Sequence, residues 1–152
     1  MAEERISWDE YFIQITELIS KRGTCPRKKV GALIVKENKI IASGYNGAPV
    51  GMKHCSEAGC IIKNDHCVRV IHAEINALLQ AGKEAKDAKL YCTCLPCEIC
   101  FKLCIQAGIK EIVYLEDYKK EDLSYWIKSG KIKLTKWKKY KEDLLSWRKD
   151  GR

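Results

Sequence analysis

Two short segments constrain the fold of this chain more than any other feature: His-Ala-Glu, from His72 to Glu74, and Pro-Cys-Glu-Ile-Cys, from Pro96 to Cys100. One imidazole, from His72, and two thiolates, from Cys97 and Cys100, supply three ligands of a tetrahedral zinc ion. The fourth position stays open for water, which is how a catalytic zinc site differs from a structural one. His-x-Glu alone is common by chance, but its pairing with Pro-Cys-x-x-Cys is rare. The fold must therefore bring both segments to one ion.

The length of 152 residues, with 46% hydrophobic residues, suits one well-filled core and is too short for two. We expect a single domain over residues 1–152, with its core motifs in residues 23–118. The sequence has no apolar run of about 18 residues, so no membrane-spanning helix is expected. The charged N-terminus lacks the apolar core of a secretion signal. Both absences predict a cytosolic protein.

The formal charge of +8 reflects 28 basic against 20 acidic residues. A basic balance favours anionic partners such as nucleotides, nucleic acid or acidic surfaces. Much of the excess lies in the lysine-rich residues 131–141, for which we favour a solvated helix face. Nine cysteines in a cytosolic protein are not expected to form disulfides, and their clustering indicates metal binding.

Apolar periodicity predicts one alternating α/β domain, in which helices cover both faces of a central sheet. Ser7 is the expected N-cap of the first helix. Residues 46–69 are expected to form a long loop without secondary structure, and such loops are usually functional or pinned by something. We expect helices at residues 8–19, 72–81, 96–107, 121–128 and 137–147, and strands at residues 30–35, 40–45, 90–93, 112–115 and 132–134.

Both metal-binding segments are expected at helix N-termini, where unpaired backbone N–H groups and the helix dipole favour thiolates. Bound zinc lowers the pKa of its water from about 15.7 to roughly 7. Glu74 is placed to accept the released proton, to protonate a ring nitrogen and then to protonate the departing amine. This pattern is the signature of the zinc nucleobase deaminases, and it predicts hydrolytic deamination. The plainer interpretation of His72, Cys97 and Cys100 is a purely structural zinc.

At this point the chain resembles the deoxycytidylate deaminases, within the cytidine deaminase-like superfamily, from about Gly23 to Tyr118. The resemblance implies a three-layer α/β/α cytidine deaminase-like fold, with a central mixed five-stranded sheet and helices on both faces. The Gly-Tyr-Asn-Gly segment separates this branch from the cytidine, guanine and tRNA deaminases. The matching motifs are Thr24-Cys25-Pro26-Arg27, Val30-Gly31-Ala32, Gly44-Tyr45-Asn46-Gly47-Ala48-Pro49, His54-Cys55, His72-Ala73-Glu74-Ile75-Asn76-Ala77, the Pro-Cys-x-x-Cys element and Gln106-Ala107-Gly108-Ile109-Lys110.

The resemblance implies the substrate dCMP, which is converted to dUMP and ammonia and so supplies a thymidylate precursor. Asn46 matches an asparagine that contacts the sugar, and the backbone of Ala73 would meet the base. Arg27 matches a residue associated with the 5′-phosphate. Tyr118 and Lys119 resemble a Tyr-Arg pair that also reaches the phosphate. Lys119 departs from that pattern, because lysine keeps the charge but lacks the bidentate fork of arginine.

Many members of the family are homo-oligomers, often hexamers, that are activated by dCTP and inhibited by dTTP. The effector nucleotide is held partly by a Gly-Tyr-Asn-Gly-x-Pro loop. The resemblance therefore implies a nucleotide-binding loop formed by Gly44, Tyr45, Asn46, Gly47 and Pro49, and it favours a hexamer.

Four further cysteines fall outside the catalytic motif. Some relatives carry a second, structural zinc in this region, and a closed site of four thiolates would pin the long loop. Free thiols, or a ligand set that includes His66 or His54, are the alternatives. The four cysteines are Cys25, Cys55, Cys60 and Cys67.

The last three cysteines are Cys92, Cys94 and Cys104, and we expect them to be buried small hydrophobes. Cys92 and Cys94 share a strand face, and Cys104 lies one helical turn beyond Cys100. A metal role for Cys104 would crowd the open position of the catalytic zinc.

Two other functions remain open. A tRNA or single-stranded DNA deaminase is suggested by the basic charge and by Trp137, Tyr140 and Trp147 among lysines, since nucleic-acid readers stack bases on aromatic rings. The helical spacing of these rings favours core packing, so we expect no nucleic-acid partner. A zinc-stabilised DNA-uptake accessory protein without turnover is the third hypothesis, against which the intact Glu74 argues.

Overall fold

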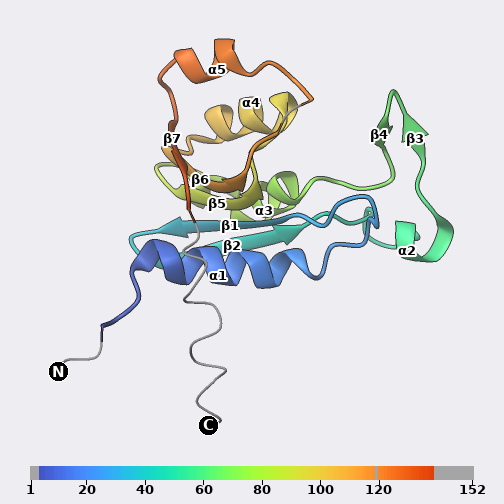
Figure 1. Ribbon diagram of the computed structural model, residues 1–152, viewed down its shortest axis with the longest axis horizontal. Helices are drawn as coiled ribbons and strands as arrows, with labels where there is room; N and C mark the ends of the chain where they lie inside the picture. The colour runs from blue at the N-terminus through green and yellow to red at the C-terminus, as the bar shows by residue number, and fades with distance from the viewer. Residues whose placement is uncertain (1–3, 119, 139–152) are drawn as a thin grey trace, which may run out of the picture.

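The described residues, 4–118 and 120–138 of the computed structural model, form a central sheet with helices packed on its faces (Figure 1). In chain order the elements are α1 (Trp8–Ser20), β1 (Gly31–Lys36), β2 (Lys39–Tyr45), α2 (Cys55–Ala58), β3 (Ile62–Lys63), β4 (His66–Cys67), α3 (Ala73–Ala81), the 3₁₀ helix η1 (Gly82–Ala85), β5 (Lys89–Cys94), α4 (Glu98–Ala107), β6 (Glu111–Glu116), α5 (Ser124–Lys128) and β7 (Lys133–Lys136).

The sheet has five strands in the order β2-β1-β5-β6-β7. β1 runs antiparallel to β2 and β5, whereas β5, β6 and β7 run parallel. The β1–β2 connection is tight because Glu37 and Asn38 adopt φ angles of 52° and 59°, the left-handed pair that a type I′ hairpin turn requires. The predicted mixed five-stranded sheet is confirmed.

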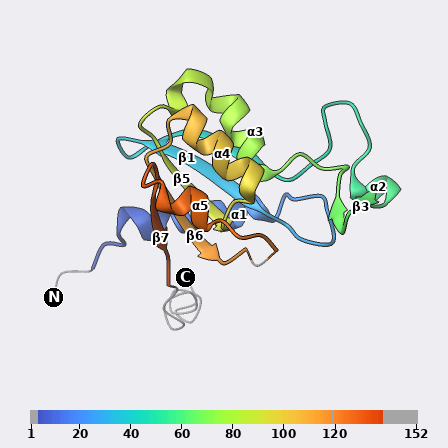
Figure 2. The same cartoon turned by 90° about the horizontal axis from the view of Figure 1, so that it is seen from above.

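Alternating side chains of β1 divide the core into two layers. Ala32 and Ile34 face α3 and α4, whereas Leu33 and Val35 face α1. Figures 1 and 2 show α1 on one face of the sheet and α3 and α4 together on the other. The predicted three-layer arrangement, with helices on both faces, is therefore confirmed.

The first helix begins where the sequence predicts. The Ser7 side chain accepts a hydrogen bond from the Glu10 N–H at 3.1 Å, as an N-cap does. Phe12, Ile13 and Thr16 are buried against the sheet. Thr16 tolerates burial because its hydroxyl donates to the Phe12 carbonyl at 2.7 Å.

The predicted absence of secondary structure in residues 46–69 is wrong. This segment contains α2 and a hairpin, β3–β4, whose two strands have two residues each. Both lie beyond one end of the sheet (Figures 1 and 2). The turn of the hairpin consists of Asn64 and Asp65, with φ angles of 49° and 61°. Asparagine and aspartate tolerate this left-handed conformation better than other residues with a side chain, which makes a two-residue turn accessible.

Two predicted helix starts are also corrected. Pro96 does not open the third helix, because Cys97 has extended backbone angles and is the N-cap of α4. α5 begins at Ser124 rather than at residue 121, because the Asp122 carboxylate accepts a hydrogen bond from the Ser124 N–H at 2.9 Å.

The predicted final helix lies almost entirely outside the described residues. Its first residue, Trp137, is described: the ring packs against the core layer under α1, and the indole N–H donates to Glu10 at 3.2 Å. Within the described ranges, no helix combines the length and the apolar composition that crossing a membrane requires.

Candidate active site

Three metal-ligand side chains converge where α3 and α4 begin. His72 is the N-cap of α3, Cys97 is the N-cap of α4, and Cys100 lies in the first turn of α4. The Nδ1 atom of His72 lies 3.5 Å from the Cys97 sulfur and 3.4 Å from the Cys100 sulfur. The ligand atoms of this group all lie within 4.8 Å of one another. The structure thus brings together the three residues that the sequence proposes as ligands.

These separations fit a zinc ion. Tetrahedral zinc with bonds of about 2.0–2.1 Å to nitrogen and 2.3 Å to sulfur separates the two donors by about 3.6 Å. One nitrogen and two sulfurs are a donor set that zinc accepts. Among residues 4–118 and 120–138, no fourth His, Cys, Asp or Glu joins the group. The open fourth position is the feature of a catalytic zinc site rather than a structural one.

The thiols and the imidazole already form a polarised set. Donation of its thiol hydrogen to Cys97, together with burial, raises the pKa of Cys100. The same hydrogen bond, with help from His72, lowers the pKa of Cys97. The hydrogen bond with Cys97 in turn raises the pKa of His72. Cys97 is therefore the thiol of the pair that loses its proton more readily, at the positive end of the α4 dipole.

Glu74 lies beside these ligands, in the first turn of α3, and is only 4% exposed. Burial raises the pKa of its carboxyl above the ordinary value. A raised pKa suits a carboxyl that accepts a proton and later returns it near neutral pH. The residue that the sequence proposes as proton carrier therefore has the environment of one.

A glycine in β2 allows α3 to approach the sheet closely. A Cβ atom on Gly44 would lie 2.3 Å from the Ala73 carbonyl oxygen and 2.6 Å from the Ala77 nitrogen. The absence of a side chain thus positions the first turn of α3, which carries Glu74 and follows His72. Gly44 has this packing role whether or not the loop that follows it binds a nucleotide.

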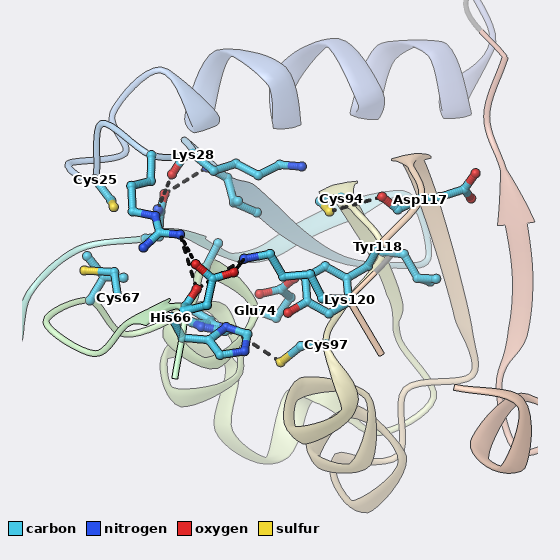
Figure 3. A pocket seen from close by; sticks show the side chains of 18 residues that line it. Cys25, Lys28, His66, Cys67, Glu74, Cys94, Cys97, Asp117, Tyr118 and Lys120 are labelled. Carbon is cyan, nitrogen blue, oxygen red and sulfur yellow. Dashed lines mark hydrogen bonds and ion pairs between the residues drawn. The ribbon is translucent and has the colours of Figure 1, made fainter. Parts of the chain in front are cut away.

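A cavity of about 380 Å³ opens beside the ligands (Figure 3). Its wall includes His72, Glu74 and Cys97. The sequence-predicted substrate residues in the wall are Arg27, Asn46, Ala73 and Tyr118. Lys119 lies outside the described residues. A cavity of this volume suits a small ligand such as a mononucleotide.

Asn46 is buried, and its amide is engaged with the loop before β1. The side-chain oxygen accepts from the Val30 N–H at 2.8 Å, and the side-chain nitrogen donates to the Lys28 carbonyl at 2.7 Å. These bonds fix the segment that follows Arg27. The amide nitrogen keeps a second hydrogen, so a sugar contact by Asn46 stays a prediction.

The rest of the predicted effector loop is held mainly by its backbone. Gly47 exchanges backbone hydrogen bonds with Ile71, at 3.3 and 2.8 Å. The Arg22 guanidinium lies over the Tyr45 ring, and its central carbon is 5.7 Å from the ring centroid. An effector role for residues 44–49, Pro49 included, stays a prediction.

Four cysteines form a second cluster, in which Cys25 comes from the connection between α1 and β1 and the other three come from the segment that carries α2 and β3–β4. Their sulfurs all lie within 4.8 Å of one another. The Cys25–Cys60 and Cys55–Cys67 separations are 3.7 and 3.5 Å, close to the roughly 3.8 Å between thiolates on tetrahedral zinc. Neither histidine alternative belongs to this cluster. The Nδ1 atom of His54 accepts from the Ala48 N–H at 3.0 Å, and His66 lies in the cavity wall.

The remaining cysteines are buried, as expected. Cys92 and Cys104 are 0% exposed, and Cys94 is 4% exposed. Cys94 also contributes to the cavity wall. Burial raises the pKa of all three thiols, which keeps them uncharged at neutral pH.

Sequence reasoning missed several residues at this site. Asp65 and Lys120 line the cavity, and Glu121 accepts a hydrogen bond from the Glu98 N–H at 2.7 Å, in the first turn of α4. The Asn64-Asp65 pair is a turn signal that could have indicated the hairpin. Nothing in the sequence distinguishes Lys120 from the neighbouring lysine.

A three-layer fold with a His/Cys/Cys centre beside a buried glutamate defines the class of zinc-dependent nucleobase deaminases. The profile of the cytidine and deoxycytidylate deaminase zinc-binding region matches residues 6–116. The chain therefore belongs to the cytidine and deoxycytidylate deaminase family.

Relatives and solved structures agree with this assignment. ComE operon protein 2 of Bacillus subtilis is 50% identical over 76% of this chain and 63% of its own length. Deoxycytidylate deaminase of Saccharomyces cerevisiae is 40% identical over 80% of this chain and 41% of its own length. The chain thus spans less than two thirds of either relative. The crystal structure of dCMP deaminase from the cyanophage S-TIM5, in complex with dCMP and dUMP, superposes with a TM-score of 0.76 at 31% identity, covering 89% of this chain and 100% of that one.

Proposed function

We propose that this protein catalyses the hydrolytic deamination of dCMP to dUMP and ammonia. The observation that carries the proposal is the placement of buried Glu74 beside His72, Cys97 and Cys100, in the wall of one cavity. The similarity to deoxycytidylate deaminases and to a dCMP- and dUMP-bound structure supports dCMP as the substrate.

The residues present define the protein's part in the reaction. Zinc held by His72, Cys97 and Cys100 would supply a water molecule whose pKa is lowered from about 15.7 to roughly 7. Glu74 accepts the proton of that water and delivers it to the ring nitrogen next to the carbon that bears the amino group. The remaining hydroxide oxygen would bond to that carbon. Glu74 then takes the second proton of the former water from this hydroxyl group and transfers it to the amino group, the carbon–nitrogen bond breaks, and ammonia leaves.

Other residues of the cavity wall would orient the nucleotide. We infer that the Ala73 backbone meets the base, that Asn46 meets the sugar, and that Arg27 binds the 5′-phosphate. Burial raises the pKa of Tyr118 to about 12, so its hydroxyl stays a hydrogen-bond donor at neutral pH. We infer that Tyr118, which lines the cavity, donates to the phosphate, and that Lys119 is the adjoining basic residue of the family pattern.

Ammonia release from dCMP by the zinc-loaded protein tests the proposal directly, with CMP, deoxycytidine and dCTP as competing substrates. Glu74→Gln should keep the zinc content and lower kcat by at least about 100-fold, because a positioned acid–base group contributes about 10²–10⁴ in rate. Glu84→Gln makes the same change at an exposed position outside the cavity wall and should leave kcat unchanged. A Glu74→Gln protein with normal turnover would contradict the assigned proton transfer.

Deamination of tRNA or single-stranded DNA is the main competing function. Trp137 gives it no support, because its ring is packed against the core and its N–H is bonded to Glu10. An assay that offers dCMP beside a short oligonucleotide separates the two activities. Turnover of the oligonucleotide alone would replace our proposal.

A zinc-stabilised DNA-uptake accessory protein is the non-catalytic alternative. The name ComE operon protein 2 refers to an operon and states no activity. If this alternative held, both the unmodified protein and its Glu74→Gln variant would contain zinc and neither would release ammonia.

We infer a second, structural zinc held by the four-cysteine cluster, because the sulfur separations in that cluster match tetrahedral zinc. Its ligands would be the thiolates of Cys25, Cys55, Cys60 and Cys67. All nine cysteines lie among the described residues and are free thiols in the structure. We also infer a cytosolic location, which the sequence predicts. The family resemblance alone supports a homo-oligomer, with a hexamer favoured, and regulation by dCTP and dTTP. Kinetics on dCMP with each effector would test the regulation.

A further inference from the structure

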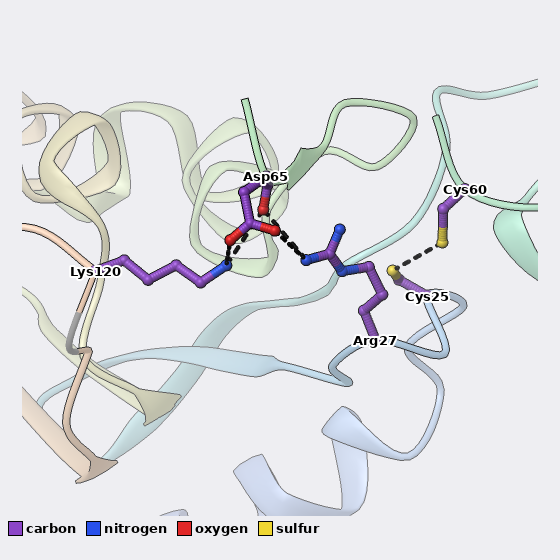
Figure 4. Close-up of polar contacts among 5 residues, drawn as sticks. All are labelled: Cys25, Arg27, Cys60, Asp65 and Lys120. Atoms are coloured by element: carbon purple, nitrogen blue, oxygen red, sulfur yellow. Dashed lines mark hydrogen bonds and ion pairs between the residues drawn. The ribbon is translucent and has the colours of Figure 1, made fainter. Parts of the chain in front are cut away.

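Three charged side chains from separate loops meet in the cavity wall: Arg27, Asp65 and Lys120 (Figure 4). The Arg27 guanidinium lies 3.2 Å from the Asp65 carboxylate and donates to the Asp65 carbonyl at 3.2 Å. The Lys120 ammonium lies 3.3 Å from the other carboxylate oxygen and donates to the same carbonyl at 3.2 Å. Asp65 thus pairs with both Arg27, which precedes β1, and Lys120, which follows β6.

A mononucleotide in this cavity needs a cationic position for its phosphate. Three arginines or lysines of the described residues line the cavity. One of them, Lys28, is paired with Glu116 at 3.1 Å. Arg27 and Lys120 are the other two, and both point at Asp65. The position between these two cations suits a phosphate, and in the structure the Asp65 carboxylate occupies it.

We propose that Arg27 and Lys120 form an anion-binding pair whose resting occupant is Asp65, and that the substrate phosphate displaces this carboxylate. The proposal rests on the proposed function, since it takes a nucleoside monophosphate as the ligand. It adds Lys120 to the phosphate contacts that the family resemblance implies and makes Asp65 a determinant of substrate affinity.

The exchange is favoured by charge and geometry. A phosphate monoester carries about −1.5 to −2 charges at neutral pH and three strong acceptor oxygens, whereas a carboxylate carries one charge. Arginine binds phosphate with two parallel hydrogen bonds. The contacts to be broken are exposed: the side chains of Arg27, Lys120 and Asp65 are 37%, 47% and 78% exposed. Exposed ion pairs are weak, so a phosphate can replace them.

The cysteine cluster restricts the movement to the tip of the hairpin. Asp65 lies in the two-residue turn between β3 and β4. Cys60 and Cys67 lie on the two sides of that hairpin, and the Cys60 sulfur is 3.7 Å from that of Cys25, two residues before Arg27 (Figure 4). The base of the hairpin is thus tied to the segment that carries Arg27, and only the turn must shift.

Titration calorimetry with dUMP and with inorganic phosphate tests the proposal on the full, zinc-loaded chain. Asp65→Asn keeps the left-handed turn and removes the competing charge, so dUMP should bind about threefold more tightly or better, because a larger fraction of the protein is competent to bind. Asp87→Asn is the matched control, since Asp87 is also exposed and has a φ of 62°. It should leave the affinity for dUMP unchanged.

Lys120→Met separates the two halves of the proposal. Loss of a phosphate contact should weaken dUMP binding, whereas tighter binding would show that Lys120 serves only to hold Asp65. An Asp65→Asn protein that binds dUMP no more tightly than the unmodified protein would overturn the proposal. Absence of ammonia release from dCMP by the unmodified protein would instead reject the proposed function, and the calorimetric comparison would still decide the anion site.

Discussion

Gly44 links the packing of the fold to the geometry of the metal ligands, and its replacement by alanine tests that link. In the structure, a Cβ atom at this position would lie 2.3 Å from the Ala73 carbonyl oxygen and 2.6 Å from the Ala77 nitrogen. Real Cβ atoms essentially never come within 3.0 Å of such atoms. The carbonyl must therefore retreat by at least about 0.7 Å.

The size of the effect follows from what the new methyl group meets. Both neighbours are backbone atoms of α3, so no side chain can rotate away and the helix must shift as a unit. Such overpacking costs about 1–3 kcal/mol in free energy of unfolding. For a domain of this length, that cost lowers Tm by about 2–12 °C. His72 and Glu74 move with the helix start, so kcat should fall at least about tenfold.

Thermal unfolding of the zinc-loaded protein, together with kcat for dCMP, measures both effects of Gly44→Ala. Gly47→Ala is the control, because a Cβ there meets its nearest neighbours, in His54 and Tyr45, at 3.4 Å. Its free energy of unfolding should change by less than about 0.5 kcal/mol. If Gly44→Ala unfolds at the same temperature as the unmodified protein, the argument from close helix–sheet packing is refuted.

Two further predictions concern the parts of the site outside the catalytic ligands. Metal analysis of the purified protein should give two zinc ions per chain, and Cys67→Ser should leave one zinc and retain dCMP deamination; a value of one in the unmodified protein rejects the second site. Glu121→Ala removes the acceptor of the 2.7 Å hydrogen bond from the Glu98 N–H. A lost helix cap costs about 1 kcal/mol, so Tm should fall by about 2–4 °C. An unchanged Tm would show that water replaces the carboxylate.

Local patterns in the sequence predicted the regular parts of the molecule well. The sequence predicts Ser7 as a helix N-cap because a serine hydroxyl can accept a hydrogen bond from the first turn, and the structure confirms this bond. The predicted first helix, residues 8–19, likewise matches α1, Trp8–Ser20. These predictions succeeded because the interactions involved span only a few residues of the chain.

Predictions failed where a distant residue decides the local structure. Proline is suited to the first position of a helix, but Cys97 rather than Pro96 precedes α4 as its N-cap, and Glu121 accepts a hydrogen bond from the Glu98 N–H of that helix. The late start of α5 has a local cause instead, because the Asp122 carboxylate accepts a hydrogen bond from the Ser124 N–H two residues further along the chain. The contact between Glu121 and the Glu98 N–H is not visible from propensities, because these two residues meet only after the elements have packed.

The sequence by itself determined which residues can hold zinc and carry protons, because an imidazole, two thiols and a carboxylate at His-x-Glu and Pro-Cys-x-x-Cys spacing limit the chemistry to few classes. Only the tertiary structure decided which charges share the cavity. Arg27, Asp65 and Lys120 are remote in the chain and meet because a hairpin, a loop before β1 and a loop after β6 converge on one cavity. Electrostatic contacts of this kind depend on distance in space, which spacing along the chain does not encode.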